Sequence, residues 1–81
     1  MTTGPTTPTR PDGAVAWETE AGRVICAQIG GQELRAQAAT LAGAEGLLHL
    51  QGRQLGAAWG VTLSASLSLG TLLVRLREAT P

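Results

Sequence analysis

This sequence predicts an all-β fold, a small antiparallel barrel or sandwich of about five to six strands behind a disordered N-terminal tail. Three observations predict it. Apolar and small residues alternate without a break from Leu55 to Gly70, and a period of two is typical of a β-strand with one apolar face. Shorter apolar runs end at glycines such as Gly30 and Gly31, which suit hairpin turns. The chain has 81 residues, enough for one thin core.

The first 13 residues differ in composition from the rest. Pro5, Pro8 and Pro11 stand there among threonines, without apolar periodicity. Such a segment cannot bury enough apolar surface to offset the entropy of ordering. We therefore expect residues 1–13 to be a disordered Thr/Pro-rich tail and residues 14–81 to form a single small β domain.

The first hairpin is expected from residues 14–20 and 23–29. A three-residue loop of Glu20, Ala21 and Gly22 would place glycine at the left-handed position that such loops favour. In this register Trp17 lies opposite Ile25, on the same face as Ile29. That arrangement gathers the large apolar side chains on one side of the sheet.

The second hairpin turns at Gly30 and Gly31, since both residues of a two-residue turn can take positive φ there. Its register places Ile29 opposite Gln32, Ala27 opposite Leu34 and Ile25 opposite Ala36. The apolar face of the first two strands then continues into the third.

A helix over residues 32–42 is the alternative for this third segment. Leu34, Ala38 and Leu41 follow a spacing of four and three residues, which one face of a helix also provides. Alanine favours helix, and Gly43 could end it. This alternative would change the class to α+β with one short helix.

The remaining strands are expected over residues 47–51, 55–70 and 72–77. In the first of these, Leu48 and Leu50 point inward and His49 outward. The long strand is expected to bend at Gly56 or Gly60, as strands do where they wrap a small barrel. The expected core consists of large apolar residues from all strands: Trp17, Ile25, Ile29, Leu34, Leu50, Trp59, Val61, Leu63, Leu67, Leu72, Val74 and Leu76.

One face of the long strand carries only small side chains, which would let a second backbone approach closely. Together with an outward leucine from the last strand, this face is the candidate interface. It comprises Gly56, Ala58, Gly60, Thr62, Ser64, Ser66, Ser68 and Leu73. We expect it to bind a protein partner or a second copy of the chain.

The ionisable residues predict no catalysis. Cys26 and His49 are the one pair that could act as nucleophile and base, and one Cys with one His is too few for a zinc site. Glu18 and Glu20 are better explained as solvated charges. We expect no enzymatic activity and no catalytic residue, bound metal or cofactor.

Nucleic-acid or phosphate binding is the alternative function. Arg35, Arg75 and Arg77 would share the outer face of the predicted sheet and could contact phosphates. The net charge is zero, however, and both tryptophans are assigned to the core, whereas nucleic-acid binders usually add a basic excess and aromatic platforms. We do not expect nucleic acid as a partner.

The sequence also indicates the origin and location of the protein. Lys, Asn, Tyr and Phe are absent, which indicates a small bacterial or phage protein from a G+C-rich genome. An apolar signal region and a stretch of 18 apolar residues are both missing, so we expect a cytoplasmic protein without a membrane partner. The most economical function is a non-enzymatic protein–protein interaction or assembly module that self-associates.

Overall fold

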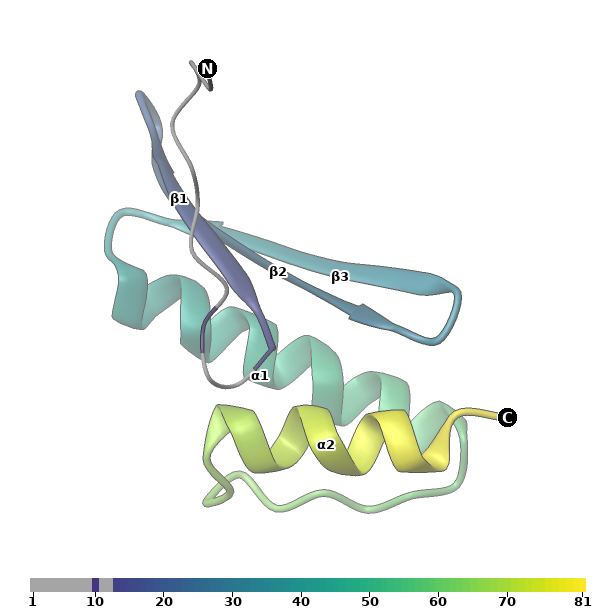
Figure 1. Ribbon diagram of the computed structural model, residues 1–81. Helices are drawn as coiled ribbons and strands as arrows, with labels where there is room; N and C mark the ends of the chain where they lie inside the picture. Colours follow the sequence, from purple (N-terminus) through teal and green to yellow (C-terminus); the bar gives the residue numbers. More distant parts are fainter. Residues whose placement is uncertain (1–9, 11–12) are drawn as a thin grey trace.

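The computed structural model describes Arg10 and residues 13–81. Three strands are followed by two helices (Figure 1): β1 (Val15–Thr19), β2 (Gly22–Ile29), β3 (Gln32–Ala38), α1 (Leu41–Ala58) and α2 (Leu69–Ala79). The strands form one antiparallel sheet in the order β1-β2-β3. Both helices pack on one face of this sheet, and the core lies between the two layers.

The predicted all-β barrel or sandwich is therefore wrong. The fold is α+β, with an open three-stranded sheet in place of five to six strands. The alternative prediction named the α+β class but placed its helix over residues 32–42, where the structure has β3. The first helix begins at Leu41 instead, directly after its N-cap residue Thr40.

The second hairpin is confirmed in register. Ile29 pairs with Gln32, Ala27 with Leu34 and Ile25 with Ala36. Gly30 has a φ of 61°, so this turn uses the left-handed conformation that glycine adopts without strain. The apolar face of β2 continues into β3 as predicted.

The first hairpin differs from its prediction. The turn holds only Glu20 and Ala21, so Thr19 pairs with Gly22 and Trp17 pairs with Val24 rather than with Ile25. Two local interactions favour this register. Glu18 meets Arg23 across the strands at 3.8 Å, which is a favourable cross-strand pair. The Ala21 backbone N–H donates to Thr19 Oγ1 at 3.2 Å, which closes the turn.

The predicted long strand over residues 55–70 is also wrong. Residues 55–58 form the end of α1 and residues 69–70 the start of α2. Residues 59–68 connect the two helices. Within this connection Val61, Leu63 and Leu67 still pack on the core while Thr62 and Ser64 are exposed. An extended segment lying on an apolar layer produces the same period of two as a strand, without a neighbouring strand to pair with.

Residues 47–51 lie inside α1 rather than in a strand. In a strand, residues two apart share a face, but in a helix they point in nearly opposite directions. Leu48 is accordingly buried whereas Leu50 is 41% exposed. Thr40 caps this helix, since its hydroxyl oxygen accepts a hydrogen bond from the Gly43 backbone N–H at 3.1 Å.

The core contains part of the set predicted from alternation. Its largest fully buried side chains are Ile25, Ile29, Leu48, Leu72, Leu73 and Leu76. Trp17 lies outside this core cluster, on the other face of the sheet, and Leu50 and Val74 are exposed. Leu73, predicted to point outward, is buried because α2 is a helix and not a strand.

Two glycines let the helical layer pack closely. A Cβ on Gly52 would lie 2.5 Å from Leu72 Cδ2, and one on Gly56 would lie 2.8 Å from Leu63 Cδ1. These distances are shorter than van der Waals contact, so the absence of a side chain is what lets α2 and the connection approach α1. The same contacts fix which side of α1 faces inward.

The disordered tail falls, apart from Arg10 and Gly13, outside the described residues. Over the part of the chain that the structure describes, neither helix combines the length and the apolar composition needed to cross a membrane.

Candidate functional site: the exposed face of α1

The solvent-exposed residues of α1 are unusual in kind. With one exception they are apolar or glycine, and none is charged: Leu41, Ala42, Gly43, Gly46, Leu47, Leu50, Gln54, Ala57 and Ala58. The charged residues of this helix, Glu45 and Arg53, occupy partly buried positions instead. A helix on the surface of a monomer normally shows the opposite distribution, with its charges toward water.

Four of these exposed residues form a regular line along the helix. Leu47, Leu50, Gln54 and Ala57 are separated by three, four and three residues, the spacing with which one helix packs along another. Leu47 is 44% exposed and Leu50 is 41% exposed. We call these four residues the α1 seam.

The second helix lacks such a surface. Its one large exposed apolar side chain, Val74, is 51% exposed and stands between the exposed residues Thr71, Arg75 and Glu78. Scattered exposed apolar residues are ordinary on protein surfaces. The contrast between the two helices makes the α1 seam the stronger candidate for a binding surface.

The opposite flank of α1 holds its polar side chains in internal contacts. Glu45 forms an ion pair with Arg10. Arg53 Nε donates a hydrogen bond to His49 Nδ1 at 3.1 Å, and His49 Nε2 meets the Leu67 carbonyl oxygen at 2.8 Å. Since Nδ1 accepts, Nε2 carries the ring proton and donates. Arg10, Glu45, His49 and Arg53 line an open hollow of about 560 Å³, and both ring nitrogens of His49 already have hydrogen-bond partners.

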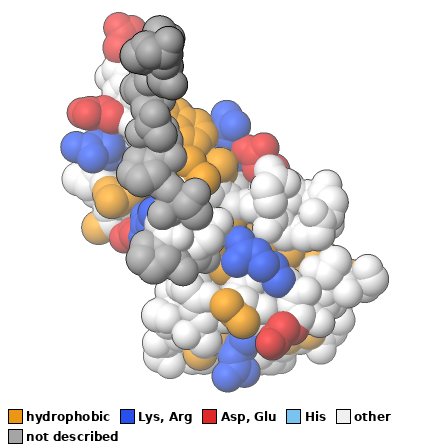
Figure 2. All heavy atoms as spheres, viewed as in Figure 1, with side chains coloured by type: hydrophobic (Ala, Val, Ile, Leu, Met, Phe, Trp, Pro, Cys, Tyr) orange, Lys and Arg blue, Asp and Glu red, His pale blue; other side chains and the backbone are white. Residues whose placement is uncertain are grey.

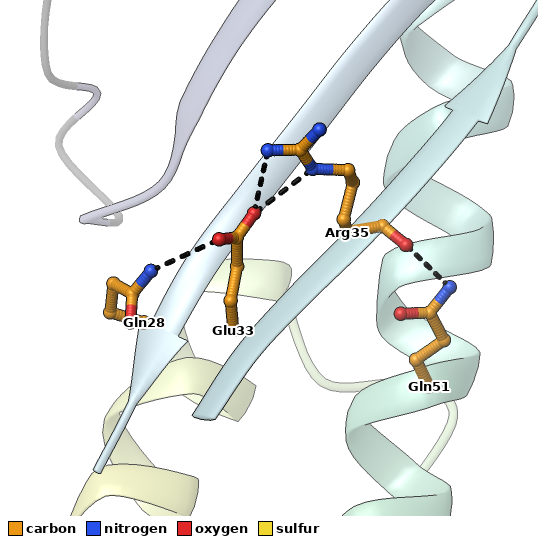
Figure 3. Close-up of polar contacts among 4 residues, drawn as sticks. All are labelled: Gln28, Glu33, Arg35 and Gln51. Carbon is orange, nitrogen blue, oxygen red and sulfur yellow. Dashed lines mark hydrogen bonds and ion pairs between the residues drawn. The ribbon is translucent and has the colours of Figure 1, made fainter. Parts of the chain in front are cut away.

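A glutamine from α1 ties the helix to the free edge of the sheet. Gln51 Nε2 donates to the Arg35 carbonyl oxygen on β3 at 2.8 Å (Figure 3). On the outer face of β3, the Glu33 carboxylate accepts hydrogen bonds from Arg35 Nε at 2.9 Å and from Gln28 Nε2 at 3.5 Å. The Gln51 contact occupies a backbone acceptor that a further strand would need.

The outer face of the sheet carries a smaller apolar cluster. Trp17, Val24 and Cys26 share this face, and Figure 2 shows apolar side chains over the sheet beside basic and acidic ones. The Arg35 guanidinium lies 5.3 Å from the centre of the Trp17 ring, within the range of a cation–π interaction. Val24 is only 5% exposed, so neighbouring side chains already cover much of this cluster.

The candidate nucleophile and base are not brought together. Cys26 lies on the outer face of β2, whereas His49 belongs to the helical layer against the inner face. Burial raises the pKa of the Cys26 thiol, and the Glu33 carboxylate raises it further, while Arg35 lowers it. The thiol is therefore a weak nucleophile at neutral pH. Among the residues with described positions, no three His, Cys, Asp or Glu side chains form a metal-binding group.

The three arginines proposed as a phosphate-binding strip lie on different parts of the fold. Arg35 is on the outer sheet face and Arg75 is exposed on α2. Arg77 Nε donates to the Gln28 carbonyl oxygen at 3.3 Å, and its guanidinium also reaches the Gly13 carbonyl oxygen at 3.4 Å. Arg77 thus links α2 to the sheet.

The two glutamates considered as a carboxylate pair have separate surroundings. Glu18 pairs with Arg23, and Glu20 lies in the first turn.

The small residues proposed as an interface do not form one strand face. Gly56 and Leu73 are buried, and Ser68 caps α2 by accepting a hydrogen bond from the Thr71 backbone N–H at 3.2 Å. The others are exposed at the end of α1 and in the connection to α2: Ala58, Gly60, Thr62, Ser64 and Ser66.

The sequence analysis does not include the α1 seam, because it predicts a strand over residues 47–51. Its spacing was nevertheless visible in the sequence.

Comparison of the chain with protein-family models, with curated proteins and with solved structures gives no match.

Proposed function

We propose that this chain is a non-enzymatic assembly module that binds a second copy of itself through the α1 seam. The observation that carries the proposal is the exposed, uncharged face of α1, on which Leu47 and Leu50 are each more than 40% exposed. Leaving such a face in water costs free energy, because burying a leucine fully is worth about 1.5–3 kcal/mol. An interface would recover part of this free energy from both copies.

The chemistry of the seam suits a second copy as its partner. Its spacing matches the line of contact between two helices, and a two-fold axis would bring the same surface of each copy together. The exposed face has no charge, and the chain has a formal net charge of zero. Two copies would therefore meet without electrostatic repulsion.

The size of the seam sets the expected strength of the association. Leu47 and Ala57 are ten residues apart, which corresponds to roughly 15 Å along a helix. One helix pair of this length buries less than the roughly 800 Å² per partner of a standard interface. We therefore expect a dimer that dissociates on dilution, with a dissociation constant on the order of micromolar or weaker.

The Leu50→Arg substitution tests this proposal. The wild-type chain should approach twice its monomer mass of 8.3 kDa as its concentration rises into the millimolar range. Leu50→Arg should remain a monomer, because each copy would bring a charged side chain into an apolar contact. Light scattering coupled to size-exclusion chromatography measures both masses.

The matched control is Val74→Arg. It introduces the same charge at an apolar position of α2 that is even more exposed, so its mass should follow the wild type at every concentration. A wild-type chain that stays monomeric, or a loss of dimer in Val74→Arg but not in Leu50→Arg, would refute self-association through α1.

A further inference from the structure

We infer that Gln54 sets the orientation of the dimer, by pairing with Gln54 of the second copy in a parallel, in-register contact of the two α1 helices. This inference rests on the proposed function. Gln54 is the one polar residue of the α1 seam, and it stands between Leu50 and Ala57 in the line of contact. It is exposed in the single chain, so water satisfies its amide until the seam is covered.

Covering the seam creates a requirement for this amide. A side-chain amide has two donors and an acceptor, and a buried amide without partners is costly. The other seam residues, Leu47, Leu50 and Ala57, have no polar side-chain atoms. Within the seam, only the same glutamine of the second copy can donate to and accept from Gln54.

A parallel arrangement about a two-fold axis meets this requirement. Each seam residue then faces the same residue of the second copy, so leucine contacts leucine and glutamine contacts glutamine. In an antiparallel arrangement that keeps the four seam residues in contact, Gln54 would face Leu50 of the second copy and lose its hydrogen bonds. A single polar residue in an otherwise apolar seam is known to select register and oligomeric state.

The orientation can be read from a disulfide placed at the end of the seam. In a Cys26→Ser background, which removes the native thiol, Ala57→Cys leaves Gln54 intact. Parallel pairing brings the two Cys side chains within disulfide reach, which requires Cα atoms closer than about 7 Å. In the antiparallel arrangement each position 57 would face Leu47 of the second copy, so the two Cys side chains would be ten residues apart, or roughly 15 Å along the helices.

The Cys26→Ser/Ala57→Cys variant is first equilibrated in a glutathione redox buffer and then analysed without reducing agent. We expect it to have twice its monomer mass, because the disulfide links the two copies. Val74→Cys in the same background reports random collisions and should stay largely monomeric. Adding Gln54→Leu should reduce the share of disulfide-linked dimer while light scattering of the reduced protein still shows association, because antiparallel pairing then has no penalty.

The outcomes separate this inference from the proposed function. A chain that associates with dependence on Leu50 but shows no excess of the disulfide at position 57 would refute the parallel pairing alone. An unchanged disulfide share in Gln54→Leu would refute the role of Gln54. A strictly monomeric wild-type chain would refute both proposals.

Discussion

Leu48→Ala should lower the free energy of unfolding by about 2–5 kcal/mol, the range for leucine truncation in a packed core. Leu48 is fully buried in the core cluster, to which both the sheet and α2 contribute. The whole chain of 81 residues should have a stability of roughly 4–12 kcal/mol at typical values per residue. The variant should therefore lose a large share of its stability and unfold at a clearly lower urea concentration than the wild type, as urea titration followed by circular dichroism would show.

The control for this prediction is Leu50→Ala. It lies two residues further along the same helix but is 41% exposed, so its stability at low concentration should change by less than about 0.5 kcal/mol. This pair also distinguishes a helix from a strand over residues 47–51. Equal losses at Leu48 and Leu50 would contradict the orientation of α1, and with it the exposed face on which the proposed function rests.

Gly22→Ala should cost more than about 2 kcal/mol of stability, since backbone strain and a steric clash add together. Gly22 begins β2 with a φ of 138°, and a Cβ there would lie 2.3 Å from the Ala38 carbonyl oxygen. A backbone atom of β3 cannot move aside as the end of a side chain can. The substitution should open the β1–β2 hairpin and lower the midpoint of thermal unfolding.

Gly31→Ala is the matched control, because this glycine lies in the other hairpin turn and a Cβ there would meet nothing within 4 Å. Its stability should be unchanged or slightly raised, since alanine restricts the unfolded chain. A comparable loss at both glycines would show that the close approach of Gly22 to Ala38 has no special role in the fold.

The sheet was partly predictable from sequence because its turns have specific requirements. Gly30 and Gly31 specified a two-residue turn, and the register of β2 with β3 followed from it. The first turn was harder to predict, since Gly22 suits the end of a three-residue loop as well as the first position of a strand. The Glu18–Arg23 pair was the signal for the observed register, and it moves Trp17 to the outer face.

The helices were missed because local alternation resembles a strand wherever small residues are frequent. In residues 55–60 the alternation comes from glycine and alanine at the end of α1. In residues 61–64 it comes from a connection that lies on the core, before a turn in which the Leu67 backbone N–H donates to the Ser64 carbonyl oxygen. The decisive signals were the caps, Thr40 before α1 and Ser68 before α2. Both are N-cap residue types, and each marks the start of a helix that the period of two hides.

The α1 seam could not be predicted for the same reason. As a strand, residues 47–51 place Leu48 and Leu50 together in the core, and the seam does not exist. As a helix, they separate Leu48 from Leu47 and Leu50, and the spacing continues to Gln54 and Ala57. The expectation of a self-associating module thus stays a prediction, now on a different surface.

The most direct test of self-association through the α1 seam is an NMR dilution series on the unmodified chain. Amide resonances of Leu47, Leu50, Gln54 and Ala57 should shift together as the concentration rises from micromolar to millimolar, while those of Val74 and of the outer sheet residue Val24 stay in place. Resonances that do not change with concentration, or shifts confined to α2 or to the sheet, would contradict the account.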